Sequence, residues 1–402
     1  IDRDIQTELT KSRKEYPVVC VTGPRQSGKT TLARAAFPEL PYVSFEEPVT
    51  RDVFAEDPKG FLSRYTDGAV FDEVQHVPEL FSYLQVMVDA RPEAGRFVVT
   101  GSQHFGLVEK VSQSLAGRTA VLVLLPFSAD ELRRGEWLAS QLNQVLWTGA
   151  YPPVHDRALR PDRWYANYLA TYIQRDVRQI TQVQNLTVFT RFLRLCAGST
   201  GQLINTNRLG TECGVDHKTV RRWLGVLEAS YVIGLLPPYH RNFRKRVVKT
   251  PKLYFYDTGL ACHLLGIETA DQLDTHPLRG ALFESWVFSE LSKAFTNQGE
   301  SSGLYFWRTH GGQEIDFLLE RSGTILAVEA KAGMTVDTRA VHTLGAAVET
   351  WGDLKVNQFI VFGGNDGMKI HGCVLLPWRK AAGIIKSSPG RSDEFGSGLI
   401  LK

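Results

Sequence analysis

Short apolar runs alternate with amphipathic stretches through the first third of the chain. The runs at residues 18–21, 42–45, 69–71, 96–102 and 120–125 have the length of buried strands, and helical spacing occurs between them. Alternation of strands and helices favours a parallel sheet with right-handed crossovers. The pattern therefore predicts an α/β fold for this region, preceded by a polar helical segment at residues 1–16.

Later segments show two further patterns. Residues 164–180 have the spacing of an amphipathic helix, and residues 205–229 suit two short packed helices that meet at a turn around Gly214. We expect Thr206 to cap the first of these two helices. An amphipathic helix is predicted at residues 281–295, followed by strands at 303–308, 314–319 and 325–331.

Composition narrows the class of protein. The 402 residues are enough for two or three domains, and 43% apolar with 22% charged residues is typical of a soluble globular protein. No apolar run approaches the ~20 residues of a membrane helix, and a signal-peptide pattern is absent. The five scattered cysteines indicate reduced thiols in a cytoplasmic protein. A net charge of +3 does not by itself indicate a nucleic-acid partner.

A glycine-rich loop connects the first strand to the first helix after it. The spacing Gly23, four residues, Gly28-Lys29-Thr30 in this context indicates a phosphate-binding loop rather than a chance glycine turn. Its amides would face phosphate oxygens, Lys29 would reach the β- and γ-phosphates of ATP, and Thr30 would hold Mg²⁺. The predicted nucleotide-contacting residues are Gly23, Pro24, Arg25, Gln26, Ser27, Gly28, Lys29, Thr30 and Thr31.

Polar residues end the two strands that follow. Asp72 and Glu73 close the strand at 69–71, where Asp72 would hold Mg²⁺ through water and Glu73 would polarise the attacking water. Thr100 or Ser102 would sense the γ-phosphate, because strand tips of such sheets face the ligand. The alternative for this pair is a simple strand-ending turn.

An arginine from a neighbouring subunit can stabilise charge on a transferred phosphoryl group. Arg118 and Arg175 are the two candidates for this role in trans. A surface ion pair is the alternative for Arg118.

Five motifs in this order resemble a large prokaryotic family of AAA-type ATPases. They are Gly-Pro-Arg-Gln-Ser-Gly-Lys-Thr at 23–30, Phe-Asp-Glu-Val-Gln at 71–75, Thr-Gly-Ser at 100–102, Leu-Ala-Gly-Arg at 115–118 and Tyr-Ile-Gln-Arg-Asp at 172–176. Gln103 departs from the family pattern, in which a second serine is expected. The resemblance implies an AAA-type core, a C-terminal domain catalogued as of unknown function, and assembly as a ring with nucleotide at the subunit boundary.

The two helices at 205–229 form a helix-turn-helix pattern, and a basic run follows them. Lys218, Arg221 and Arg222 would lie on the exposed side of the second helix, where groove-reading residues are found. The basic run at 240–252 predicts a wing-like hairpin that contacts DNA or RNA phosphates. Its candidate contacts are Arg241, Arg244, Lys245, Arg246 and Lys249. A plain packing module with a solvated basic face is the alternative.

The C-terminal segment carries a second set of chemically suggestive residues. Glu284 on a helix, Asp316 on a strand and Glu329-x-Lys331 on the next strand resemble the PD-(D/E)xK nuclease superfamily. The resemblance implies that Asp316 and Glu329 share one or two Mg²⁺, or Mn²⁺, with Glu284 completing the oxygen ligands. Lys331 would orient or help deprotonate the attacking water and offset phosphate charge. An inactive descendant of such a nuclease is the alternative.

Together these features predict an α/β protein with several parts. We assign 1–135 to an AAA-type ATPase core, 136–190 to a helical lid or linker, 191–270 to a winged helix-turn-helix and 271–390 to a nuclease-like domain; residues 391–402 resemble a cloning linker. The predicted function is an Mg²⁺-dependent ATPase that remodels or translocates DNA and cleaves it, with branched or recombination-type DNA as substrate. We expect a homo-oligomeric ring, a hexamer, with DNA as partner and no membrane. The alternative is an ATP-switched DNA-binding regulator or scaffold whose nuclease-like domain is inactive.

Overall fold

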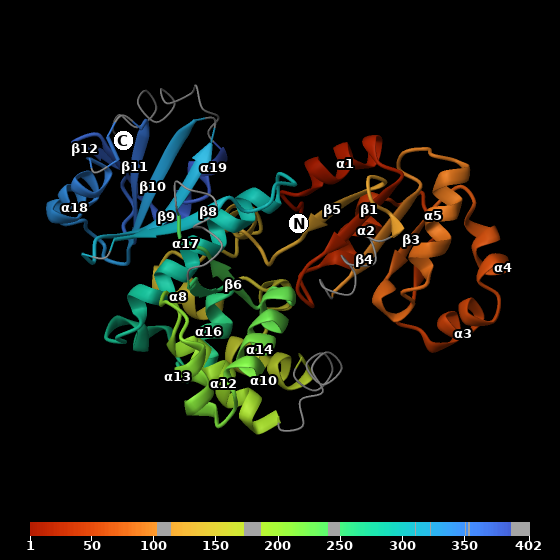
Figure 1. Ribbon diagram of the computed structural model, residues 1–402, viewed down its shortest axis with the longest axis horizontal. Helices are drawn as coiled ribbons and strands as arrows, with labels where there is room; N and C mark the ends of the chain where they lie inside the picture. The colour runs from red at the N-terminus through yellow and green to blue at the C-terminus, as the bar shows by residue number, and fades with distance from the viewer. Residues whose placement is uncertain are drawn as a thin grey trace. The chain divides into compact units, whose positions relative to one another are not determined.

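The computed structural model of the protein describes residues 1–102, 114–172, 186–239, 250–309, 311–321, 323–349, 351–352 and 354–386 (Figure 1). The chain divides into two compact units. The first consists of Ile1–Phe127, Ala229–Tyr231 and Thr296–Ser301, and the second of Ser128–Glu228, Val232–Phe295 and Ser302–Lys402.

A five-stranded parallel sheet forms the centre of the first unit, in the order β2-β3-β4-β1-β5. The strands are β1 (Val18–Thr22), β2 (Tyr42–Ser44), β3 (Ala69–Asp72), β4 (Phe97–Gly101) and β5 (Thr119–Val123). They coincide with the apolar runs of the sequence and confirm the predicted α/β fold with a parallel sheet. Because β1 lies between β4 and β5, the loop that follows β1 starts from an interior strand of the sheet, next to the edge strand β5.

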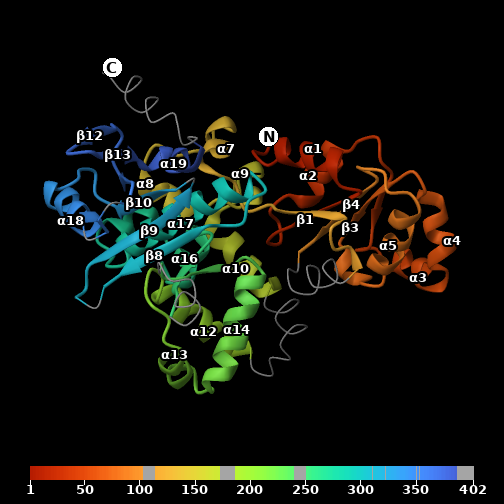
Figure 2. The same ribbon diagram turned by 45° about the horizontal axis from the view of Figure 1, so that its top comes forward.

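Helices cover both faces of this sheet (Figure 2). They are α1 (Gln6–Glu15), α2 (Lys29–Ala36), α3 (Pro48–Glu56), α4 (Pro58–Leu62) and α5 (Leu80–Ala90). Successive side chains of a strand point to opposite faces. Val18 and Cys20 accordingly pack with residues of α3, α4 and α5, whereas Val19 and Val21 pack with residues of α1 and α2.

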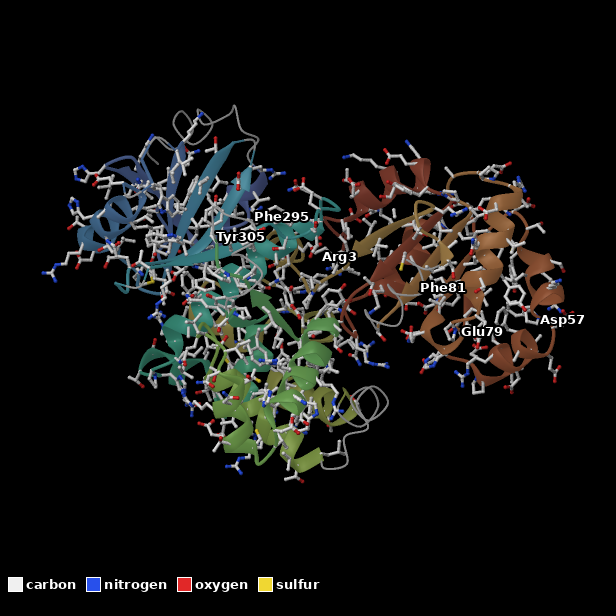
Figure 3. The ribbon with its side chains drawn as sticks, viewed as in Figure 1. Arg3, Asp57, Glu79, Phe81, Phe295 and Tyr305 are labelled. Atoms are coloured by element: carbon white, nitrogen blue, oxygen red, sulfur yellow. The ribbon has the colours of Figure 1, made fainter. Side chains whose placement is uncertain are left out.

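Aromatic side chains fill the core on the α5 side of the sheet. The rings of Phe45 and Phe71 stack with centroids 6.0 Å apart, and those of Phe71 and Phe97 with centroids 6.1 Å apart. Phe81 on α5 belongs to the same cluster (Figure 3). This row of rings, which crosses neighbouring strands, holds the carboxyl end of β3 in place relative to β4.

The second unit begins with helices. They are α7 (Ala129–Arg134), α8 (Leu142–Thr148), α9 (Pro152–Asp156), α10 (Pro161–Tyr172), α12 (Leu186–Gly198), α13 (Thr206–Cys213), α14 (His217–Ala229), α16 (Thr258–Leu264) and the 3₁₀ helix η4 (Ala270–Asp274). Two antiparallel strands, β6 (Ile233–Leu236) and β7 (Lys252–Phe255), follow α14. Gly214 has a left-handed φ of 72° and makes the turn between α13 and α14.

One helix start differs from the sequence prediction. Asn205, not Thr206, caps α13: its side chain accepts a hydrogen bond of 2.9 Å from the amide of Arg208. Asn205 has the extended backbone that a cap requires, whereas Thr206 is already the first helical residue. A short amide side chain one position earlier therefore reaches the free amide of the first turn.

A six-stranded sheet completes the second unit, in the order β12-β13-β11-β10-β9-β8. Its strands are β8 (Leu304–Arg308), β9 (Glu314–Arg321), β10 (Thr324–Lys331), β11 (Val356–Phe362), β12 (Met368–Ile370) and β13 (Cys373–Pro377). The associated helices are α17 (Arg279–Thr296), α18 (Thr338–Glu349) and α19 (Gly383–Lys386). β9 pairs antiparallel with β10, whose other neighbour, β11, runs parallel to it.

α17 is not the amphipathic helix that its sequence predicts. Its residues from Ser285 to Phe295 are all buried, including Glu290 and Lys293, which pair with each other at 2.9 Å. Serines and a paired charge give the sequence an amphipathic pattern, although this part of the helix is buried on every side. A buried central helix is a more rigid support for Glu284 than a surface helix would be.

Two negative findings concern the described residues. None of the described helices is both long and apolar enough to span a membrane. The five cysteines all lie within the described ranges, and each is a buried free thiol, in agreement with the sequence prediction.

The core of the first unit predicts a contrast between two positions on α5. Leu84 is fully buried, whereas Val86 is 69% exposed on the same helix. Leu84→Ala should lower the free energy of unfolding of this unit by about 2–5 kcal/mol, because it leaves a cavity. Val86→Ala, the matched control, should change it by less than about 0.5 kcal/mol. Calorimetric unfolding measures both; equal effects would contradict the assigned core.

Candidate functional site

The loop after β1 has the backbone that phosphate binding requires. Gly23 has φ of +148°, and a Cβ at this position would lie 2.2 Å from the carbonyl oxygen of Leu124. Only glycine fits there, because both the conformation and the close approach exclude a side chain. Gln26 and Gly28 also have positive φ, of 59° and 94°. These turns bring the chain directly into α2, whose amino end adds a favourable field for anions.

Lys29 lies within this loop. Its ammonium donates hydrogen bonds to the carbonyl oxygens of Gly23, at 3.1 Å, and of Pro24, at 2.7 Å. The residue is only 5% exposed. Its charge is therefore fixed over the glycine turn, where a bound phosphate would meet it.

Three elements meet at Asp72, which is 3% exposed at the end of β3. Its carboxylate accepts hydrogen bonds from the hydroxyl of Thr30, at 2.9 and 3.1 Å, and from the hydroxyl of Thr100 on β4. Tyr42 on β2 donates a further hydrogen bond of 2.6 Å. A carboxylate beside a threonine hydroxyl is an oxygen donor set that fits Mg²⁺. Thr30, Asp72 and Thr100 are thus brought together as the sequence prediction requires.

Glu73 is held next to this group. It has a left-handed φ of 57° and accepts a hydrogen bond from the side-chain amide of Gln75. The same amide group lies 3.4 Å from the hydroxyl of Ser102. Ser102 is therefore linked to Glu73 through Gln75, whereas Thr100 contacts Asp72 directly. The imidazole of His76 pairs with Glu46 at 3.5 Å beside them.

Arg118 lies at the opposite edge of the sheet from the loop. Its carbonyl accepts a hydrogen bond from the amide of Val18, at the amino end of β1, and its side chain pairs with Asp89 at 2.5 Å. The five residues of β1 span about 16 Å between this position and the loop. Arg118 therefore cannot act at the nucleotide of its own chain, and a role in trans stays a prediction. Arg175 and Gln103 lie outside the described residues.

Sequence reasoning missed Arg3, which supports the loop from the N-terminal segment (Figure 3). Its guanidinium donates hydrogen bonds of 2.7 Å to the carbonyls of Ser27 and Leu125, and it lies 4.8 Å from the ring centroid of Phe127. Arg3 is 8% exposed. No motif marks it, because an arginine in a polar lead-in segment looks like an ordinary surface residue.

The second constellation gathers four carboxylates, which we call the acid cluster: Glu284 on α17, Glu314 and Asp316 on β9, and Glu329 on β10. Pairing of β9 with β10 brings Asp316 beside Ala330, whose amide donates to it at 2.9 Å. Lys331 donates to Glu329 at 2.8 Å, so these two side chains share a face of β10. The structure thus brings together the four residues predicted at this site.

Lys252 also enters the acid cluster, which corrects the sequence interpretation of this residue as part of a basic surface hairpin. It is 2% exposed, and its ammonium lies 3.0 Å from Glu284, in contact with Glu314 and 3.8 Å from Asp316. Lys252 opens β7, whose pairing with β6 turns its side chain inward. The other basic candidates of this run, Arg241, Arg244, Lys245, Arg246 and Lys249, lie outside the described residues.

Burial perturbs the ionisation of the acid cluster. Burial and the charge of Asp316 raise the pKa of Glu284 to about 7, against the opposing charge of Lys252. Burial and Asp316 likewise raise the pKa of Glu329 to about 8, against Lys331. Burial alone would lower the pKa of Lys252, but the neighbouring carboxylates raise it. Perturbed carboxylates around one point are typical of sites that bind a cation or transfer protons.

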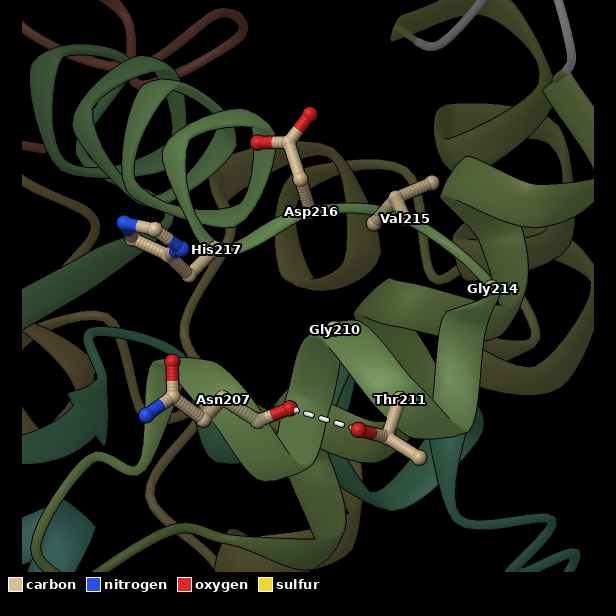
Figure 4. Close-up of a pocket in the computed structure, with 7 residues that line it drawn as sticks. All are labelled: Asn207, Gly210, Thr211, Gly214, Val215, Asp216 and His217. Carbon is tan, nitrogen blue, oxygen red and sulfur yellow. Dashed lines mark hydrogen bonds between the residues drawn. The ribbon is translucent and has the colours of Figure 1, made fainter.

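The helix pair at α13 and α14 presents the predicted basic residues to solvent. Lys218, Arg221 and Arg222 are exposed on α14. Asp216 caps this helix by accepting a hydrogen bond of 2.8 Å from the amide of Thr219, and that bond lowers the pKa of Asp216. A shallow pocket lies between the end of α13 and this cap (Figure 4). The exposed residues suit phosphate contact, which stays a prediction.

Comparison with known proteins finds matches to three successive segments of the chain. Residues 15–133 match an AAA domain, residues 139–271 a domain of unknown function (DUF8612) and residues 279–381 another domain of unknown function (DUF4143). The uncharacterized proteins Rv2008c of Mycobacterium tuberculosis and Mb2031c of Mycobacterium bovis are each 33% identical over 338 residues, covering 83% of this chain and 74% of theirs. The chain belongs to the family of these two proteins. Its first unit is a nucleotide-binding AAA-type P-loop ATPase domain.

Solved structures share less with the chain. The Walker-type ATPase PABY2304 of Pyrococcus abyssi is 16% identical, with a TM-score of 0.45, over 65% of this chain and 94% of that one. A RuvB protein of Thermotoga maritima is 15% identical, with a TM-score of 0.28, over 58% and 89%. Both TM-scores are below 0.5, so neither likeness bears on the function of this chain.

The support that Arg3 gives the loop generates a prediction. Arg3→Met removes the donors to the carbonyls of Ser27 and Leu125, bonds of a charged donor that contribute about 1.5–3 kcal/mol each. We expect ATP affinity to fall about tenfold, or about 1.4 kcal/mol. Lys11→Met, which changes an exposed charge on α1, is the control and should leave affinity unchanged. Titration of a fluorescent ATP analogue measures both; unaltered binding by folded Arg3→Met would remove Arg3 from the site.

Proposed function

We propose that this protein is a cytoplasmic Mg²⁺-dependent ATPase that acts on DNA and carries a metal-dependent DNA-cleaving site in its second unit. The observation that carries the proposal is the convergence of Thr30, Asp72 and Thr100 beside the phosphate-binding loop. The cleavage half rests on the acid cluster. Branched or recombination-type DNA is the substrate class that would use a motor and a nuclease together.

At the ATP site each residue has a distinct role. Lys29 would neutralise the β- and γ-phosphates, and Thr30 with Asp72 would hold Mg²⁺, which would offset the charge of the phosphates. Glu73 polarises the attacking water, and its Gln75 contact fixes its orientation. In a homo-oligomeric ring, with a hexamer as our preferred size, Arg118 would act on the neighbouring subunit's nucleotide.

At the acid cluster, Asp316 and Glu329 would hold Mg²⁺ or Mn²⁺, with Glu284 completing the ligands. The cluster fits a hard cation, because it offers carboxylate oxygens and burial, which raises the pKa of Glu284 and Glu329, disfavours their charge unless a cation compensates it. A bound ion would lower the pKa of water and withdraw charge from a phosphodiester. Lys331, which already touches Glu329, would orient that water.

The second candidate function is an ATP-switched DNA-binding regulator or scaffold with an inactive nuclease-like domain. One observation favours it: the ammonium of Lys252 already pairs with Glu284 and Glu314. Such pairing lowers the affinity for metal ions, because the same carboxylates must serve both cations. This candidate retains ATP binding and DNA binding but has no cleavage.

Separate substitutions in the two units test the main proposal. Lys29→Ala should abolish ATP turnover, because the phosphates lose their fixed charge. Asp316→Ala should lower Mg²⁺-dependent DNA cleavage by about 10²-fold or more. Glu320→Ala, an exposed acid on the same strand, is the matched control and should cleave normally. Both activities are measured on linear, forked and four-way DNA.

The outcome distinguishes the two candidates. Cleavage of at least one DNA form that depends on Asp316 supports the nuclease. If the unaltered protein cuts none of these forms yet binds DNA with an affinity that depends on nucleotide, the regulator is the correct function.

Contact between α14 and DNA gives an independent prediction. Substituting Lys218, Arg221 and Arg222 together with Ala should weaken DNA binding. The slope of log K against log salt should fall by about 0.9 for each phosphate that the protein no longer neutralises. Ala at Lys11 and Lys14, exposed lysines on α1, is the control. Fluorescence anisotropy at several salt concentrations measures the slope; an unchanged slope would exclude α14 from the interface.

A further inference from the structure

Lys252 is the most deeply buried charge of the acid cluster. Its side chain is 3% exposed, whereas those of Glu284, Glu314 and Asp316 are 17%, 26% and 14% exposed. A buried ammonium is retained only where carboxylates compensate the loss of water. Its position is therefore tied to these three acids.

The backbone and stem of Lys252 are fixed as firmly as its charge. It pairs with Leu236 across β6 and forms a bridge to Leu203 on its other side. The ammonium lies 6.0 Å from the ring centroid of Tyr254 and 5.7 Å from that of Phe306. The hydroxyl of Tyr254 donates to the same oxygen of Glu284 that accepts from Lys252. Both the backbone and the side chain of Lys252 are therefore fixed at the acid cluster, unlike those of a surface lysine.

The charges of the cluster determine how many metal ions it can hold. With all four carboxylates ionised, the buried ammonium of Lys252 leaves three negative charges. Lys331 pairs with Glu329 and Arg308 with Glu314, but their side chains are 44% and 47% exposed, so water screens part of their charge. One divalent cation, together with these two exposed groups, neutralises the cluster. A second would leave excess positive charge in a largely buried site, which is unfavourable.

We propose that Lys252 takes the place of a second metal ion, so that the acid cluster binds a single divalent cation. Two-metal sites place their ions about 3.5–4 Å apart between shared carboxylates. The ammonium of Lys252 already lies between Glu284, at 3.0 Å, and Asp316, at 3.8 Å. Lys252 is a positioning residue that fixes Glu284 and Glu314, and the ion is held by Asp316 and Glu329, with Glu284 completing the ligands. This inference rests on the proposed metal site.

Manganese stoichiometry tests the inference. The full chain is titrated with Mn²⁺, with Asp72→Asn present throughout so that the nucleotide site does not hold the ion. Electron paramagnetic resonance counts the bound ions in this protein and in the same protein with Asp316→Asn as a further substitution. The difference between the two counts is the number of Asp316-dependent ions. With Lys252 intact we expect one such ion, with the spectrum of an isolated Mn²⁺. Lys252→Met, similar in shape but neutral, should bind two ions with a coupled spectrum, and Lys252→Arg should bind one.

Each outcome has a distinct meaning. Two Asp316-dependent ions with Lys252 intact, or one ion in folded Lys252→Met, overturns the role of Lys252 and leaves the metal site standing. No Asp316-dependent ion with Lys252 intact overturns the metal site itself and the cleavage function with it. Circular dichroism reports folding. If Lys252→Met does not fold, the test uses the spectrum of the protein with Lys252 intact. A spectrum of two coupled Mn²⁺ ions there would refute the inference, and that of one isolated Mn²⁺ would support it.

Discussion

A carboxylate taken out of water needs donors or cations around it, and both units of this protein are built around such groups. In the first unit the carboxylate is Asp72, whose partners are hydroxyls from β2, β4 and α2. In the second unit the carboxylates of the acid cluster are compensated by lysines from β7 and β10. In each case the partners come from elements that only the tertiary fold brings together, so the fold and the site depend on the same contacts.

The nucleotide site is a rigid platform made from the ends of parallel strands. The glycine turn at Gly23 is pressed against the carbonyl of Leu124, and Arg3 ties Ser27 to Leu125. The phosphate-binding loop is therefore joined, by its backbone, to the segment that leaves β5. The loop and this segment therefore share the same supporting contacts.

In the acid cluster, one residue changes which function the sequence motif supports. A helix glutamate, a strand aspartate and Glu-x-Lys are compatible with a nuclease, a structural ion-pair network or an inactive descendant. Lys252 places a positive charge among these acids, and the charge balance then favours one divalent ion over two. Lys252 is also the residue that favours the regulator as the second candidate function. The number of bound ions is therefore relevant to both candidate functions.

The sequence by itself determined the glycine loop, the strand and helix alternation and the order of Glu284, Asp316, Glu329 and Lys331, because these depend on local spacing and on periods of 2 and 3.6 residues. Tertiary structure alone decided that Arg3 supports the loop, that Lys252 faces acids instead of solvent, and that α17 is buried on all sides from Ser285 to Phe295. Lysine and arginine have the same local preferences on a surface as in a buried pair. Whether such a residue is exposed or buried in an ion pair depends on partners from distant segments of the chain. A local sequence pattern does not identify those partners.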